Sequence, residues 1–144
     1  MKDLHEAIPA RGYRQEQRAD DKQRSRRAHV KYKGSCHCGK VAFEVEGDLN
    51  GAMACNCSMC SRKGSLLWFV PREQLRLLTS EEDLGTYTFN KHVIKHRFCR
   101  TCGIHPYGEG TDPKGNRMAA INIRCLAGID LESVPVQHFD GRSL

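Results

Sequence analysis

The chain has 144 residues, of which 39% are hydrophobic, so it can form one domain and a tail but not a large multidomain enzyme. Its longest purely apolar run, Leu66 to Val70, excludes a membrane-spanning helix, which needs about 20 such residues. The opening sequence, MKDLHEAIPARGYRQEQ, lacks the apolar stretch of a secretory signal. We therefore expect a cytoplasmic protein, in a reducing compartment and without a membrane partner.

The net charge of +6 is unevenly distributed along the chain. Residues 1–29 hold 8 Lys or Arg against 5 Asp or Glu, and they contain no apolar stripe. We interpret this segment as a basic arm, flexible or partly helical, ahead of a domain at residues 30–144. Charge runs of this kind are usually solvated, and the alternative is that the arm contacts nucleic acid or a protein partner.

The texture of the sequence changes at His29, after which apolar and polar residues alternate. In the segment VAFEV, the side chains of Val41, Phe43 and Val45 fall on one face, as in a half-buried strand. Gly and Pro then separate one short apolar segment from the next, and no long helical periodicity follows. The predicted fold class is therefore all-β, with short strands.

The run Leu66–Val70 predicts a buried strand that ends at Pro71. We expect Trp68 and Phe69 in the core, and the alternative is that they form a wall of a substrate site. The next expected elements are a helical turn and a short strand within Arg72–Ser80, then strands at Leu84–Phe89, His92–Phe98, Arg117–Arg124 and Val136–Phe139.

Seven of the eight cysteines lie in three tight groups with the sequences CHC, CNCSMC and CRTC. In a reducing compartment, such groups are more typical of metal ligands than of disulfides. The seven are Cys36, Cys38, Cys55, Cys57, Cys60, Cys99 and Cys102, and the eighth, Cys125, has no cysteine near it in the sequence. We expect Cys125 to be a buried thiol, or else a fourth ligand to one of the groups.

The first and last groups are predicted to form one four-thiolate site. Cys99 and Cys102 have the CxxC spacing that directs both sulfurs at one metal, and Cys36 and Cys38 would face the same side of an extended strand. A Gly follows each pair and permits the tight turn. Four thiolates form a closed, structural zinc site, which could contribute about 10 kcal/mol to folding.

The central group offers three sulfurs, Cys55, Cys57 and Cys60, with no fourth cysteine nearby. Three protein ligands leave one position of a zinc ion open, which is typical of a catalytic site. Two alternatives remain open from spacing: a closed site completed from elsewhere in the chain, or a redox or metal-free cluster. The residues that could complete a closed site are Cys125, His92, His96 and His105.

Zinc with three thiolates carries a formal charge of −1, so it is a poor activator of water but can hold a substrate thiol. The cluster therefore favours chemistry at sulfur over hydrolysis. Arg62 and Lys63, two and three residues after Cys60, are either solvated charges or cations that attract an acidic thiol such as glutathione.

Three histidines add weaker expectations. His105, in GIHPYGEG, is either an acid–base or carboxylate-binding group or a residue of a turn. His92 and His96 are expected on one face of a strand, as surface residues or as part of a site.

The segments GSCHCGKVAFEV, CNCSMC and FCRTCG, in this order, resemble the glutathione-dependent formaldehyde-activating family, whose domain is also found in centromere protein V. The resemblance extends over roughly Val30 to Asp140, and TYTFNKHVIKHRFC and the closing HFDG add to it. It implies a small Mss4-like all-β fold with two zinc ions. It also implies a structural zinc on Cys36, Cys38, Cys99 and Cys102, and a catalytic zinc on Cys55, Cys57 and Cys60.

The family reaction joins glutathione to formaldehyde and is classed with carbon–sulfur lyases. We therefore predict a zinc-dependent carbon–sulfur lyase that forms or cleaves a thiol–aldehyde adduct, resembling S-(hydroxymethyl)glutathione synthase. The alternative is a non-catalytic zinc module that engages nucleic acid or a protein partner through the basic arm.

Overall fold

The computed structural model describes residues 30–143, so the predicted arm at residues 1–29 lies outside the described residues. Within residues 30–143 the chain consists of short strands, 3-10 turns and one α-helical turn, α2 (Cys60–Lys63), none with the length and apolar character that a membrane crossing requires. The strands are β1 (Val30–Ser35), β2 (Ala42–Gly47), β3 (Ala52–Cys55), β4 (Leu67–Pro71), β5 (Leu75–Leu77), β6 (Leu84–Tyr87), β7 (Lys95–Cys99), β8 (Tyr107–Thr111), β9 (Arg117–Asn122) and β10 (Val136–Phe139).

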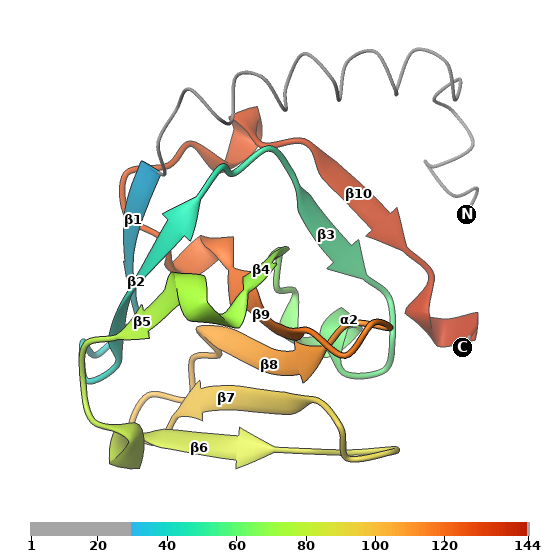
Figure 1. The fold of residues 1–144 in the computed structure, drawn as a ribbon, viewed down its shortest axis with the longest axis horizontal. Helices are drawn as coiled ribbons and strands as arrows, with labels where there is room; N and C mark the ends of the chain where they lie inside the picture. The colour runs from blue at the N-terminus through green and yellow to red at the C-terminus, as the bar shows by residue number, and fades with distance from the viewer. Residues whose placement is uncertain (1–29, 144) are drawn as a thin grey trace.

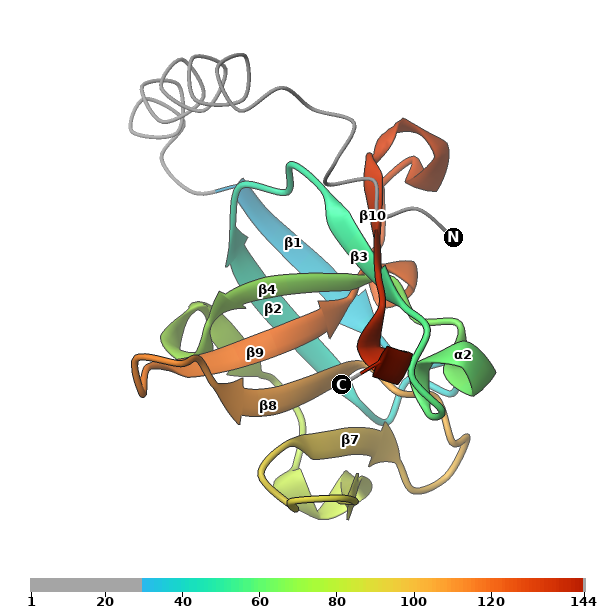
Figure 2. The same cartoon turned by 90° about the vertical axis from the view of Figure 1, so that its right-hand side faces the viewer.

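These strands form two sheets (Figure 1). The smaller is antiparallel, with the order β1-β2-β5, and the larger has the order β10-β3-β4-β9-β8-β7-β6. In the larger sheet, β10 pairs with β3 in parallel, whereas the other pairs are antiparallel. Figures 1 and 2 both show β10 side by side with β3 at one margin of the molecule. The small Mss4-like all-β fold that the sequence predicts is confirmed.

The alternation predicted for the VAFEV segment determines how β2 packs. Phe43 and Val45 are fully buried, and Phe43 pairs in register with Gly34 of β1. A Cβ atom at Gly34 would lie 2.3 Å from Cζ of Phe43, so the ring occupies the space that a side chain would fill. The packing of Phe43 in the smaller sheet therefore requires a glycine at position 34.

Two edge-to-face aromatic contacts join the sheets. Tyr32 of β1 meets Trp68 of β4 with ring centroids 5.6 Å apart, and Phe43 of β2 meets Tyr107 of β8 at 5.9 Å. Ile121 of β9 is fully buried in the same core. Full burial of a large apolar side chain contributes about 1.5–3 kcal/mol, so this shared core binds the two sheets into one domain.

Several predicted elements need correction. β4 has buried and exposed residues in alternation, so Trp68 is buried as predicted but Phe69 is 46% exposed, and the prediction for Phe69 was wrong. The turn Arg72–Gln74 followed by β5 confirms the expectation for that segment. β7 begins only at Lys95, and His92 lies in the preceding turn with φ of 56°, so His92 and His96 do not share a strand face.

Candidate metal centres

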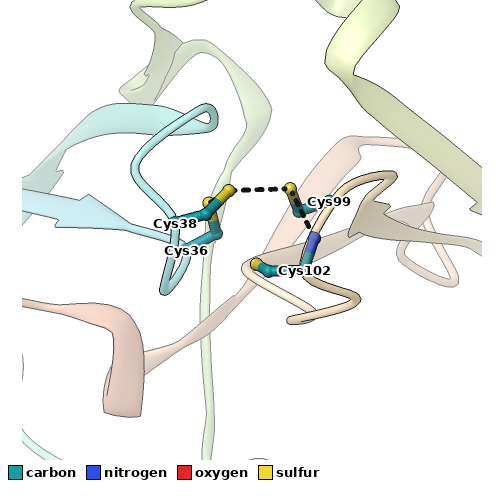
Figure 3. A group of neighbouring side chains, drawn as sticks. All are labelled: Cys36, Cys38, Cys99 and Cys102. Carbon is teal, nitrogen blue, oxygen red and sulfur yellow. Dashed lines mark hydrogen bonds between the residues drawn. The ribbon is translucent and has the colours of Figure 1, made fainter.

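The first cluster joins cysteines from two loops that are far apart in the sequence. Cys36 and Cys38 lie between β1 and β2, whereas Cys99 ends β7 and Cys102 follows it. The four sulfur atoms lie within 4.8 Å of one another. Figure 3 shows the two pairs facing each other. Sγ of Cys38 lies 3.6 Å from that of Cys36 and 3.7 Å from that of Cys99. This arrangement has the ligand count of a closed tetrahedral site.

Both loops have the same local construction. The main-chain N–H of Cys36 donates to the carbonyl of Val41 at 2.9 Å, and that of Cys99 donates to the carbonyl of Ile104 at 2.8 Å. Within each loop a glycine takes a left-handed conformation, with φ of 85° at Gly39 and 79° at Gly103. L-residues rarely adopt this conformation, so the Gly after each cysteine pair is what lets the chain turn back toward the metal position.

Main-chain N–H groups directed at the sulfurs favour the thiolate form. The N–H of Val41 lies 3.3 Å from Sγ of Cys36, and the N–H of Cys102 lies 3.5 Å from Sγ of Cys99 (Figure 3). Main-chain N–H groups of Cys38 and Ile104 lower the pKa of the Cys102 thiol to about 6. Thiolate donors at this spacing fit a divalent, borderline-soft cation such as zinc.

The second cluster lies at the end of β3. Cys55 is the last residue of β3, Cys57 lies in the following turn, and Cys60 begins α2. Their three sulfurs lie within 4.8 Å of one another, and all three residues are half-buried. The N–H of Cys57 lies 3.4 Å from Sγ of Cys55, and that of Cys60 lies 3.3 Å from Sγ of Cys57. The cluster therefore also fits a thiophilic divalent cation, with three protein ligands.

Among residues 30–143, no fourth His, Cys, Asp or Glu joins the three sulfurs within that distance. Cys125 lies instead beside the four-cysteine cluster. Its thiol pKa is raised to about 11, first by burial and then by the nearby charges of Cys36 and Cys102. The structure thus places the predicted fourth-ligand candidates elsewhere and leaves the second cluster with three described donors.

The three histidines occupy different positions. His92 lies in an exposed turn, where Nδ1 and Oγ1 of Thr88 are 2.7 Å apart. His96 and His105 are both 8% exposed, and their ring centroids are 6.0 Å apart. Among residues 30–143, no group forms a hydrogen bond of normal geometry with either ring nitrogen of His105. Burial, and then the charge of Lys63, lowers the pKa of His105 to about 3 and also lowers that of His96, so both rings are neutral at pH 7.

The two cations after Cys60 have different roles. Arg62 donates from Nη1 to the carbonyl of Ser58 at 2.6 Å and so secures the turn that carries Cys57. Lys63 has no carboxylate partner among the described residues, and its ammonium interacts with the charge of Cys60 and with both buried histidines. Lys63 is therefore the cation of this region that is available to an anionic ligand.

The C-terminal segment contributes to the second cluster in a way that the sequence analysis did not foresee. The side chain of Asn56, between two cysteines, is hydrogen-bonded to Asp140, and the Cα of Gly141 faces the sulfur of Cys55. The pKa of the Asp140 carboxyl is held below its usual range, first by the hydroxyl of Ser143 and then by Asn56. The sequence signal that could have indicated this contact is Asn56, a polar residue between two cysteines in CNC, together with the closing HFDG.

Two comparisons with known proteins agree with this picture. A family model described as "Glutathione-dependent formaldehyde-activating enzyme" matches residues 31–139. A crystal structure of a Rhodobacter sphaeroides protein is similar to this chain, with 34% sequence identity and a TM-score of 0.63. That similarity covers 72% of this chain and 98% of the other.

Proposed function

The chain belongs to the glutathione-dependent formaldehyde-activating family, and from this premise we propose that it is a zinc-dependent carbon–sulfur lyase, acting on a thiol–aldehyde adduct at Cys55, Cys57 and Cys60. The observation that carries the proposal is the three-sulfur cluster to which no described residue adds a fourth donor. A zinc ion held there would supply Lewis-acid chemistry, which lowers the pKa of a thiol.

In the synthetic direction, the sulfur of the thiol adds to the carbonyl carbon of the aldehyde. One carbon–sulfur bond forms, the carbonyl π electrons move to oxygen, and that oxygen takes up the proton that the thiol releases. No electron leaves or enters, so no redox cofactor is needed. The reverse reaction breaks the same bond and returns both substrates.

The chain's own residues would bind and orient the thiol. Lys63, three residues after Cys60 and without a carboxylate partner among the described residues, would attract an acidic thiol such as glutathione. The four-cysteine cluster would hold a second, structural zinc, because its closed donor set leaves no position for a substrate. We place the protein in the reducing cytoplasm, where eight free cysteines persist as thiols.

The test is zinc content and zinc coordination on freshly reduced protein, with and without glutathione. We expect two zinc ions per chain, and X-ray absorption should show the mean number of sulfur neighbours rising toward four when glutathione is added. If the zinc at the three-cysteine cluster keeps the same neighbours when glutathione is added, the site is closed. The protein would then be a non-catalytic zinc module.

A variant provides the second arm of the test. Cys57→Ser should lose one zinc and all adduct-forming activity while keeping its fold, because the four-cysteine site remains. Cys125→Ser is the matched control, since Cys125 belongs to neither cluster. Full activity in Cys57→Ser with one fewer zinc would contradict the proposed mechanism.

A further inference from the structure

The C-terminal residues lie directly against the turn that carries Cys55 and Cys57. The parallel pairing of β10 with β3 puts Phe139 in register with Cys55, and the main-chain N–H of Asn56 donates to the carbonyl of Phe139 at 3.1 Å. Figure 2 shows the end of this segment beside the chain that leads from β3 into α2. Because β10 ends beside Cys55, residues 140–143 lie next to the three-cysteine cluster.

The side chain of Asn56 is held on both of its polar atoms. Nδ2 donates to Oδ1 of Asp140 at 2.9 Å, and Oδ1 accepts from the main-chain N–H of Arg142 at 2.9 Å. The second carboxylate oxygen of Asp140 accepts from Oγ of Ser143 at 2.6 Å. An amide can donate and accept in this way at once, which a carboxylate cannot. Both oxygens of Asp140 accept hydrogen bonds, and neither lies within 4.8 Å of all three sulfurs, so this carboxylate is a partner of Asn56 and not a donor to the cluster.

Gly141 controls the space beside the sulfurs. A Cβ atom at this position would lie 2.7 Å from Sγ of Cys55 and 3.2 Å from Cβ of Cys57. Contacts below 3.0 Å require something to move, and here the atom that must move is a candidate metal ligand. The φ of Gly141 is not in the left-handed region, so the glycine is needed for its missing side chain and not for its conformation.

The two clusters differ in this respect. Each half of the four-cysteine cluster is shaped by a turn within its own loop, with its own glycine. The three-cysteine cluster has its own turn, but its central residue, Asn56, is fixed by hydrogen bonds to residues 84 and 86 positions away. Loss of those bonds would leave Asn56 joined to the C-terminal segment by its main-chain hydrogen bond to Phe139.

We propose that Asn56, Asp140 and Gly141 are positioning residues that set the affinity of the three-cysteine cluster for zinc by holding Cys55 and Cys57 in place. The proposal rests on the metal-binding part of the proposed function and not on the reaction. Hydrogen-bonded partners behind metal ligands typically account for about 10–100-fold in metal affinity.

The test is competition between the full chain and a chelator of known zinc affinity, which resolves the weaker from the tighter zinc. In Asn56→Asp, two carboxylates face each other and the donor to Asp140 is lost, so we expect the affinity of the weaker site to fall about 10–100-fold. The affinity of the four-cysteine site should not change.

The double variant Asn56→Asp with Asp140→Asn exchanges the two groups and keeps the net charge of the chain. The new carboxylate at position 56 accepts from the N–H of Arg142 and from the new amide at position 140, so the pair is restored. We expect recovery of most of the lost affinity. Failure of the exchange to restore zinc binding in a folded protein would overturn the role of the Asn56–Asp140 pair.

Gly141→Ala tests the steric part, with Gly110→Ala as its control, because a Cβ at Gly110 meets only Cγ1 of Ile94 at an ordinary 3.6 Å. We expect Gly141→Ala to weaken the same site, and to alter the visible spectrum of cobalt bound there, while Gly110→Ala does neither. Wild-type affinity in both Gly141→Ala and Asn56→Asp would overturn the proposal. A wild-type chain that binds a single zinc would instead remove the proposed catalytic centre itself.

Discussion

The two cysteine clusters of this domain use the same donor atom in opposite ways. The four-cysteine cluster joins loops that are 61 residues apart; Cys36 and Cys99 are buried in the core, and Cys38 is exposed. The three cysteines at the end of β3 come from one six-residue stretch and are half-buried. The first cluster links distant parts of the chain, whereas the second links only neighbouring residues. Sequence span thus separates the site that we propose to be structural from the one that we propose to meet a substrate.

The thiols within each cluster influence one another. In the four-cysteine cluster, main-chain N–H groups lower the pKa of Cys102 and that of Cys99, whereas at Cys38 the main-chain N–H of Lys40 is outweighed by burial and by the neighbouring thiols, and its pKa rises to about 11. In the three-cysteine cluster, burial, followed by hydrogen bonding and the charge of its neighbours, raises the pKa of Cys60 well above its usual range, while the pKa of Cys57 is lowered. A bound cation would favour the thiolate forms in both clusters. Four experiments can break or sharpen the contrast in sequence span.

The largest expected effect comes from removing one ligand from each cluster. A structural zinc contributes about 10–16 kcal/mol at pH 7, which is as large as the total stability of a typical domain. Cys99→Ser should therefore leave the domain unfolded at 25 °C, whereas Cys57→Ser should keep its secondary structure. Circular dichroism and thermal unfolding check this. Equal loss of structure in the two variants would contradict the division of roles.

A methyl group added in β1, two residues before Cys36, should cost less. In Gly34→Ala the new Cβ would lie 2.3 Å from Cζ of Phe43, and such overpacking typically costs about 1–3 kcal/mol. Urea unfolding in saturating zinc measures this, and Gly110→Ala again serves as the control. A change below about 0.5 kcal/mol would mean that the Phe43 ring is free to shift.

The buried histidine predicts a pH dependence. The pKa of His105 in the folded chain is about 3, below its value in the unfolded chain of about 6.5. As pH falls from 6.5 toward 3, only the unfolded chain takes up this proton, so folded stability is lost, by at most about 1.4 kcal/mol per pH unit. His105→Gln should remove this part of the slope in urea unfolding at pH 7 and pH 5. If the free energy of unfolding fell equally between pH 7 and pH 5 in His105→Gln and in the wild-type chain, the ring would not be buried in its neutral form.

The smallest effect concerns the unpaired cation. Lys63→Met should raise KM for glutathione about fivefold, equivalent to about 1 kcal/mol, and leave KM for an uncharged thiol unchanged. Lys40→Met is the matched control beside the other cluster, since Lys40 follows Cys38 by two residues. The same loss with both thiols would indicate that Lys63 supports α2 and does not bind substrate.

The sequence predicted the fold class and the grouping of the cysteines because both depend on local patterns. Short spacings bring neighbouring sulfurs together, and the alternation around Phe43 determines the buried face of β2. Strand β8 was missed because its sequence, YGEGT, has two glycines and little β-forming character, and its pairing with β9 supplies what local propensity lacks.

The remaining differences concern contacts between distant residues. The exposure of Phe69 follows from the pairing of β4 with β9, which buries only one of its faces. The bonds of Asn56 depend on β10 returning in parallel to β3, and no local pattern specifies a partner 84 residues away. The sequence also could not tell which of Arg62 and Lys63 is available to an anionic ligand. The difference arises because Arg62 donates to the carbonyl of Ser58 and Lys63 does not.

The parallel pairing of β10 with β3 also imposes an order on how the protein is completed during synthesis. Chains grow from the N-terminus at about 5–20 residues per second, so the 84 residues between Asn56 and Asp140 take roughly 4–17 s to make. Cys102 emerges before Asp140, and the four-cysteine cluster can therefore close while the rest of the chain is still being translated. Until residues 140–143 have been made, the three thiols of the other cluster lack the contacts with Asp140 and Gly141. During that time they are exposed to oxidants and to competing metal ions in the cell.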